Sequence, residues 1–329
     1  MTQRPRPVPV VSRVAFISVA AFSVVGAGAG LAAAPASDVV RLTAATNITL
    51  RQTPGPGAPA VAQLPLGSEV TEVGPPGMDK TWIRVRAANG SEGWLQAKLT
   101  ARLDPTWRWT TYDRIIADRL ARKGDGFAAS VELVSFIDRV SKEYTNPDGK
   151  AQVELGRLRA ISNALSAIPA NGYRREPMSS WLKSLGPVVV FDEPGGRYLL
   201  ADKPIWDLHT RSAKAPVADD IAWLAVTNGL GGECEGYLPC YVDWRNRLEG
   251  EYLRRHPDGR HAGTAVATVK GTVDRLTGSS AFAFDRGRDC KDLTAQVDAL
   301  VKAVQVTRAV DKDATLASLG TLRRVCGGV

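Results

Sequence analysis

The spacing of apolar residues changes once along this chain, at Asp104-Pro105, and the change divides the sequence into two regions of different fold class. Before it, short runs of alternating apolar and polar residues are separated by Gly and Pro, which is typical of β-strands joined by tight turns. After it, apolar residues recur at steps of three and four, the period of amphipathic helices. The chain has 329 residues, enough for about two domains. We therefore expect a multidomain protein, a small all-β domain followed by a mainly α-helical one.

Five short strands are expected in residues 41–103. The clearest are residues 47–51, in which Ile48 and Leu50 share one face, and residues 81–86. Asn89-Gly90 follows the second of these and favours a tight hairpin turn. The remaining strands are centred on Val61 and Leu64, on Val70 and Val73, and on residues 93–95. Strands this short, with turns this regular, predict a small barrel.

The same region carries a series of short motifs in a fixed order. They are Ile-Thr-Leu-Arg, Val-Ala-Gln-Leu-Pro-Leu-Gly, Val-Thr-Glu-Val, Thr-Trp-Ile-Arg-Val, Asn-Gly, Glu-Gly-Trp-Leu and Ala-Lys-Leu. Over residues 41–103 this series resembles the bacterial SH3 (SH3b) domains of cell-envelope proteins, apart from a long turn at Gly74–Lys80. The resemblance implies an SH3-like barrel that acts as a targeting module, binding peptidoglycan peptides or a protein partner. It implies no chemistry for this domain.

Three side chains are candidates for ligand binding in this barrel: Trp82, Trp94 and Arg51. A barrel of this size needs large apolar side chains, so one interpretation places both tryptophans in its core. The other places part of an indole ring against a shallow peptide groove, since Trp combines an apolar surface with a polar N–H group. Arg51 would then meet a carboxylate of the ligand, or would be an ordinary solvated surface charge.

Residues 104–329 are expected to be helical with one β-hairpin. Apolar stripes predict helices near 115–120, 127–140, 155–168, 221–226, 248–253, 262–276, 293–304 and 316–325. Asn146-Pro147-Asp148-Gly149 is interpreted as the end of the second stripe. Residues 187–201 predict the hairpin, with its turn at Glu193–Gly196. The sequence Glu251–Val266 resembles the helix–turn–helix exit of a tetratricopeptide repeat, but it occurs once, and a solenoid needs at least three units.

All four cysteines lie in the helical region. An even number of cysteines in an exported protein favours a disulfide framework. Cys234 and Cys240 are close enough along the chain to pair locally, and a Cys290–Cys326 bond would close an antiparallel helix pair, although four cysteines allow three pairings. The competing interpretation is a cysteine nucleophile or a zinc site, the latter using Cys234, Cys240, His256 and His261; in an oxidising compartment we expect no metal.

Residues 1–36 are expected to be a secretory signal peptide. Arg4, Arg6 and Arg13 precede an uncharged apolar stretch, and small residues at Ala34 and Ala36 favour cleavage after Ala36. The alternative is an uncleaved anchor, because residues 14–34 could span a bilayer. Either way, the positive end stays inside and the rest of the chain is exported to the periplasm or the extracellular space. A membrane is a partner only if the segment is uncleaved.

The remaining patterns argue against most enzyme and nucleic-acid functions. The whole chain has a net charge of +8, and without the three arginines of residues 1–36 it would be about +5, a mild attraction to anionic surfaces. No run of Lys and Arg with interleaved aromatic residues suggests nucleic-acid binding. No cofactor motif is present. Ser180-x-x-Lys183 lacks the Lys-Thr-Gly partner of penicillin-recognising enzymes. The sequence therefore predicts a non-enzymatic binding or adaptor protein with no catalytic residues. The alternative is a cell-wall hydrolase with an unrecognised catalytic domain at 104–329, in which Glu233 or Glu235 would be the general acid.

Overall fold

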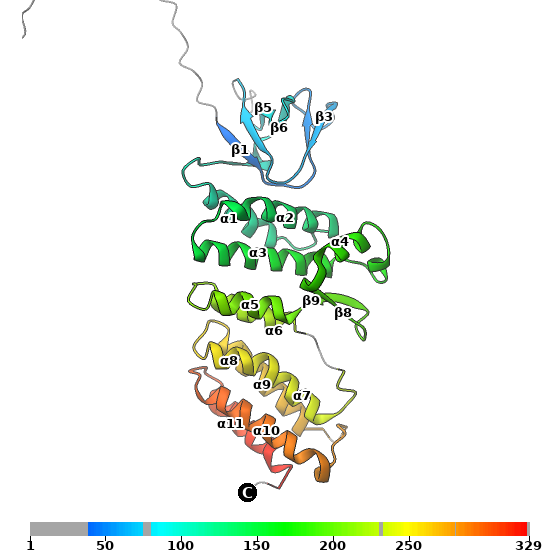
Figure 1. Cartoon of the computed structure of the whole chain (residues 1–329), viewed down its shortest axis with the longest axis vertical. Helices are drawn as coiled ribbons and strands as arrows, with labels where there is room; N and C mark the ends of the chain where they lie inside the picture. The colour runs from blue at the N-terminus through cyan, green and yellow to red at the C-terminus, as the bar shows by residue number, and fades with distance from the viewer. Residues whose placement is uncertain (1–38, 75–79, 230–232, 280, 328–329) are drawn as a thin grey trace, which may run out of the picture. The chain divides into compact units, whose positions relative to one another are not determined.

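The computed structural model describes residues 39–329, except for residues 75–79, 230–232, 280 and 328–329. The expected signal peptide, residues 1–36, lies outside the described part. All described residues belong to one compact unit, Asp38–Val329, drawn in Figure 1. No helix among them is both long and apolar enough to cross a membrane.

The N-terminal part of the described chain is an antiparallel sheet of seven strands in the order β3-β2-β6-β5-β4-β1-β7. The strands are β1 (Val40–Thr43), β2 (Ile48–Arg51), β3 (Ala60–Leu64), β4 (Glu69–Glu72), β5 (Trp82–Ala87), β6 (Glu92–Gln96) and β7 (Thr100–Arg102). A 3-10 turn at Ala97–Leu99 leads into β7. The prediction of a small all-β domain is confirmed; the count of five strands is wrong, because it omits β1 and β7.

The sheet encloses a small apolar core of its own. Alternate residues of the strands point into it, as the period of two along a strand requires. Its buried members are Ile48, Leu50, Leu64, Val70, Ile83, Val85, Ala87 and Leu95. Neither Trp82 nor Trp94 belongs to this core, and both indole side chains are half-buried.

The strands that the sequence did not predict connect the sheet to the helices. Leu42 on β1 and Ala101 on β7 belong to the apolar core of the first helices rather than to the sheet's own core. The turn after β3 is hydrogen-bonded to α2, because the Leu66 N–H donates to Glu132 Oε1 at 2.6 Å and Arg139 Nη2 donates to the Leu66 carbonyl at 2.6 Å. Gly67 lies beside the Phe136 ring, where a Cβ atom would be 2.1 Å from Cδ2.

The rest of the chain is mainly helical, as predicted, with a two-stranded hairpin. The helices are α1 (Arg108–Leu120), α2 (Phe127–Val140), α3 (Pro147–Ser166), α4 (Met178–Leu185), α5 (Asp202–Arg211), α6 (Ala218–Thr227), α7 (Leu238–Arg245), α8 (Glu251–Arg255), α9 (Ala262–Thr277), α10 (Arg286–Gln305) and α11 (Lys312–Arg324). A π-helical turn at Asn246–Gly250 joins α7 to α8. The hairpin consists of β8 (Val189–Asp192) and β9 (Arg197–Leu200), inside the predicted range 187–201.

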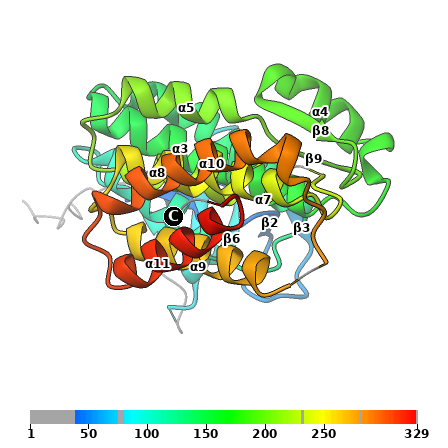
Figure 2. The same ribbon diagram turned by 90° about the horizontal axis from the view of Figure 1, so that it is seen from below.

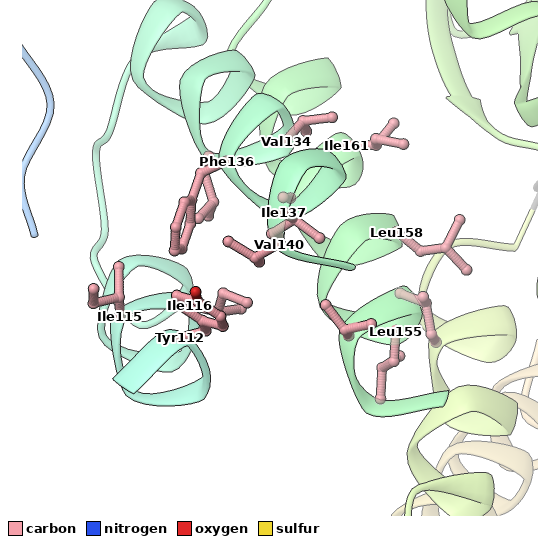
Figure 3. Close-up of a cluster of buried hydrophobic side chains, with 14 of the residues drawn as sticks. Tyr112, Ile115, Ile116, Val134, Phe136, Ile137, Val140, Leu155, Leu158 and Ile161 are labelled. Atoms are coloured by element: carbon pink, nitrogen blue, oxygen red, sulfur yellow. The ribbon is translucent and has the colours of Figure 1, made fainter. Parts of the chain in front are cut away.

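Helices α1, α2 and α3 form the first helical core, shown in Figure 3. Each helix contributes apolar residues at steps of three and four. In Figure 3, Phe136 and Val140 of α2 and Ile116 of α1 lie in the space between these two helices. Tyr112 and Phe136 are fully buried with their rings edge to face, 6.0 Å apart. The hydroxyl group of Tyr112 donates to Glu143 at 2.9 Å, so the buried ring keeps a polar partner.

The pair α5–α6 packs against both the first core and a second core built from α7 to α11. Ile221 and Leu224 on α6 face the first core, whereas Ala222 and Val226 face the second. Trp206 on α5 packs against both. In Figure 2, α11 lies beside α9 and α10.

Both predicted disulfides are present. Cys234 pairs with Cys240 and Cys290 pairs with Cys326, each with a Cα–Cα distance of 5.4 Å. The second bond joins the second turn of α10 to a residue just after α11, so it closes this helix pair as expected.

Candidate functional site

The candidate site lies on the outer face of the N-terminal sheet. On β5, Ile83 and Val85 point into the core, so Trp82 and Arg84 point outward. Trp82 is paired with Gln96 of β6, and Arg84 with Trp94. Residues directly opposite each other in antiparallel strands share a face. The two tryptophans are therefore diagonal neighbours on one exposed face.

A glycine determines how β2 joins this face. Gly93 is buried between β6 and β2, and a Cβ atom there would lie 2.6 Å from the Arg51 carbonyl oxygen and 2.8 Å from Leu50 Cγ. Only a residue without a side chain lets the two backbones approach this closely. The approach pairs Arg51 with Trp94. The Gly-Trp motif thus positions all three candidate side chains on the same surface.

The two arginines on the outer face of β5 share a single carboxylate of β6, that of Glu92. Arg84 Nη2 lies 3.0 Å from Glu92 Oε2, and Arg86 Nε donates to Glu92 Oε1 at 2.8 Å. Hydrogen bonding from Arg86, supported by the nearby charge of Arg84, lowers the pKa of Glu92. These three residues form a network with one net positive charge, in which each guanidinium group already contacts a carboxylate oxygen.

Arg51 differs from them because its charge has no carboxylate partner within the described part of the chain. Its Nη1 donates to the Ala58 carbonyl at 2.6 Å, a neutral acceptor in the turn that follows β2. This bond orients the guanidinium without compensating its charge. An arginine held this way can form a charge-assisted hydrogen bond to an incoming carboxylate.

Arg51 and Trp82 line a common groove of about 250 Å³. Asn47, Thr49 and Gln96 contribute polar atoms to it. Trp94 is not among the lining residues, although it is paired with Arg51. The groove therefore combines an aromatic surface, an uncompensated cation and amide groups.

The polar residues of the groove were missed by sequence reasoning. Asn47 adopts a φ of 52°, a left-handed conformation that Asn tolerates better than most residues. An Asn residue directly before a strand is the sequence signal that indicates a turn at this position. Gln96 is recognisable only once the register of β5 with β6 places it opposite Trp82. The long turn at Gly74–Lys80 cannot be placed against the groove, because residues 75–79 lie outside the described part.

The comparison with known families decides what this fold is. Residues 46–101 match the bacterial SH3 domain family. The match spans β2 to β7, and so includes Arg51, Trp82 and Trp94 and confirms the resemblance. No family match covers the rest of the chain. No curated protein and no solved structure matches the chain.

The residues of the alternative hydrolase hypothesis are less organised than this bacterial SH3 groove. Glu233 and Glu235 flank the buried Cys234, and both side chains are exposed. Glu235 has a φ of 40°, so it contributes to a tight loop. Ser180 is also exposed, and its hydroxyl donates to Glu176 at 2.8 Å. All three side chains therefore lie at the surface, and none of them lines the groove that holds Arg51 and Trp82.

The cysteine and histidine residues of the zinc hypothesis belong to three separate pairs. Cys234 and Cys240 are bonded to each other, so neither is a thiolate that could bind metal. His256 instead lies with Nε2 2.8 Å from His209 Nε2, and His261 Nε2 lies 3.1 Å from Asp220 Oδ1. Within the described residues, no three side chains of the metal-binding types are arranged as ligands.

Proposed function

We propose that this protein is an exported, non-enzymatic binding protein whose bacterial SH3 domain holds it at the cell wall. The observation that carries the proposal is that Arg51 and Trp82 line one groove. This groove lies on a domain whose family suggests a cell-wall or protein-binding module. The two disulfides support export, since such bonds persist in oxidising compartments.

The groove favours a short peptide with a free carboxylate. The guanidinium of Arg51 supplies the charge-assisted contact, and the exposed part of the Trp82 ring supplies apolar surface for an aliphatic side chain or a methyl group. Asn47 and Gln96 can hydrogen-bond to peptide groups. A stem peptide of peptidoglycan has this chemistry. An envelope protein with an exposed acidic segment is the other partner of this kind.

The helical region would then contact another envelope protein, giving an adaptor. The sheet covers apolar residues of α1 and α2, because Leu42, Leu66 and Leu103 are buried in their core. Deleting the sheet would expose that surface and promote unspecific sedimentation. Point variants of the groove are therefore the better test of targeting.

The experiment is co-sedimentation of the purified protein with peptidoglycan sacculi, with soluble muropeptides assayed in the supernatant. Trp82→Ala and Arg51→Gln test the groove, and Arg102→Gln on β7, an exposed arginine that does not line it, is the matched control. We expect the unchanged protein and the control to pellet, the groove variants to remain largely soluble, and no muropeptide release.

Each of the other outcomes would contradict one part of the proposed function. If all variants pellet equally, the groove is not the wall-binding site. If the unchanged protein does not pellet, the domain does not bind the wall and its partner is a protein. Release of muropeptides would contradict the non-enzymatic assignment and direct mutagenesis to Glu233 and Glu235.

A further inference from the structure

A second pocket lies in the helical region, away from the SH3 groove. Its volume is about 560 Å³, and it opens where the loop between α1 and α2 meets the last turns of α3. Its polar and charged lining residues are Arg119, Arg122, Lys123, Asp125, Ser130, Asn163 and Ser166. Nothing in the proposed wall-binding function uses it.

Arg119 is the unusual residue of this pocket, because its side chain is buried with incomplete compensation. Only 4% of the residue is exposed. Its Nη2 donates to Asp125 Oδ2 at 2.6 Å, while Nε is buried without any hydrogen-bond partner. Burial lowers the pKa of Arg119, the Asp125 carboxylate opposes that effect, and the neighbouring Arg122 adds to it. A buried cation with an unpaired donor is costly unless something else satisfies it.

The first turn of α2 forms another part of the same lining. Gly126 is its N-cap and provides no side-chain cap, and Ala129 and Ser130 line the pocket. The first N–H groups of a helix have no acceptor within the helix, and the helix dipole gives this end a partial positive charge. At 14 residues, α2 is long enough for this effect. The N–H groups of residues 127–129 are thus available to an oxyanion.

The exposed charges at the rim of the pocket are positive. Arg122 and Lys123 are exposed at its rim. Their positive charges also interact favourably with the partial negative charge at the C-terminal end of α1. That interaction alone would be a purely structural role. Asp125 is the one carboxylate among the lining residues, and Arg119 already engages it. The remaining positive charge faces an opening with Asn163 and Ser166 of α3 on its other side.

We propose that this pocket binds the oxyanion group, phosphate or carboxylate, of a small organic molecule. The oxyanion accepts hydrogen bonds from the first turn of α2 and from Arg119, with Arg122 and Lys123 contributing charge. The volume exceeds that of a bare ion, and Leu120, Leu133 and Ala167 provide apolar surface for the rest of the ligand. A molecule of the size of a sugar phosphate or a dipeptide fits these dimensions.

The test is a titration of the ¹⁵N-labelled purified protein at constant ionic strength, followed by the amide signals of residues 127–129. The probes are glycerol 3-phosphate for the phosphoryl source and N-acetylalanine for the carboxylate source, with inorganic phosphate as the bare ion. We expect saturable shifts at these amides. Whichever organic probe binds more tightly identifies the chemistry of the ligand.

Two variants connect the binding to the pocket without removing the buried Arg119. The double substitution Arg122→Gln with Lys123→Gln removes two exposed charges and is expected to weaken binding about tenfold. Ala129→Glu places a carboxylate in the first turn of α2, where acidic residues stabilise helices, and fills the site with an internal anion. It should abolish binding with the melting temperature kept or raised. Arg114→Gln, exposed on α1 and outside the pocket, is the control and should bind as the unchanged protein does.

Two results overturn the proposal. One is the absence of saturable shifts at residues 127–129 with all three probes. The other is binding that survives Ala129→Glu, which would place the anion elsewhere on the protein. Because Ala129 is far in sequence from the SH3 groove, neither result depends on whether the protein binds peptidoglycan.

Discussion

Arg51 on β2 lies directly opposite Trp94 on β6, and this pair sets the register between the two strands. The pairing exists because Gly93, the residue before Trp94, leaves room for the β2 backbone. Arg51 is thereby held beside the groove that Trp82 lines. The ligand-binding geometry of the SH3 domain therefore depends on a residue that has no side chain of its own.

Replacing Gly93 by Ala is expected to destabilise the protein by about 1–3 kcal/mol, because the new methyl group would overlap the Arg51 carbonyl oxygen and β2 would have to move. Urea denaturation measures this change. Gly57→Ala is the control, since a Cβ there meets nothing within 4 Å, and it should change stability by less than about 0.5 kcal/mol. Equal effects of the two substitutions would contradict the close approach of β2 and β6.

Gly67→Ala tests the contact between the sheet and α2. Gly67 has a φ of +73°, and its Cβ would lie 2.1 Å from the Phe136 ring. Gly74 has a similar φ of +76° with nothing within 4 Å, so Gly74→Ala carries only the conformational cost, about 1 kcal/mol. We expect Gly67→Ala to cost about 1–3 kcal/mol more than this control, since overpacking is added. The two substitutions would have equal effects if Phe136 did not pack against the turn after β3.

The two disulfides are expected to contribute unequally to stability. Cys290 and Cys326 are 36 residues apart, and Cys234 and Cys240 only 6 apart. On the chain-entropy estimate, replacing the first pair with alanines costs about 4 kcal/mol and replacing the second about 2 kcal/mol. Thermal denaturation of the two double variants compares them. A larger loss from the Cys234–Cys240 pair would show that constraint of the unfolded chain is not the dominant effect.

Acid is expected to destabilise the helical region through His209. This residue is 4% exposed, with Nε2 facing His256 and a buried Nδ1 that has no partner. Burial, followed by the charges of His256 and Arg255, lowers the pKa of His209 from 6.5 to about 4, with Glu251 opposing. Between these two pKa values the unfolded state therefore binds more protons than the folded state. The free energy of unfolding has its full value above about pH 6.5 and decreases as the pH falls toward 4, by up to about 3 kcal/mol.

Urea denaturation of the unchanged protein and of His209→Leu between pH 7.5 and 4.5 measures this effect. The variant should lose much of the pH dependence over this range. Part of the pH dependence should remain, because burial also lowers the pKa of His256. The charge of Asp219 opposes this lowering. An unchanged pH profile in the variant would exclude His209 as its source.

The local elements were predictable where one residue pattern dominates. The alternation in residues 81–86 gives β5, and the spacing from Phe127 to Val140 gives α2 with the boundaries found in the structure. Asn146-Pro147-Asp148-Gly149 was interpreted only as a helix end. It begins α3, with the Asn146 side chain accepting from the Gly149 N–H at 2.6 Å. An N-cap followed by Pro is a start signal, and its position after another helix concealed it.

Tertiary context explains what the sequence did not predict. β1 and β7 are short and flank the recognised motifs, and Leu42 and Ala101 are buried only because α1 and α2 cover them. α5 was also missed, since its few apolar residues become a core face only between two other layers. For the candidate site, Arg51 and Trp82 were identified from sequence, but their shared groove depends on the pairing of β2, β6 and β5.

The most direct measurement of the central claim is the indole N–H signal of Trp82 in ¹⁵N-labelled protein titrated with soluble muropeptides, assigned with Trp82→Phe. Contact of a stem peptide with the groove predicts a saturable shift of this signal that Arg51→Gln weakens or removes. The indole of Trp107, 54% exposed and outside the groove, should not shift. A Trp82 signal that stays in place while the protein binds muropeptides would contradict the account, because the ligand would then occupy another surface.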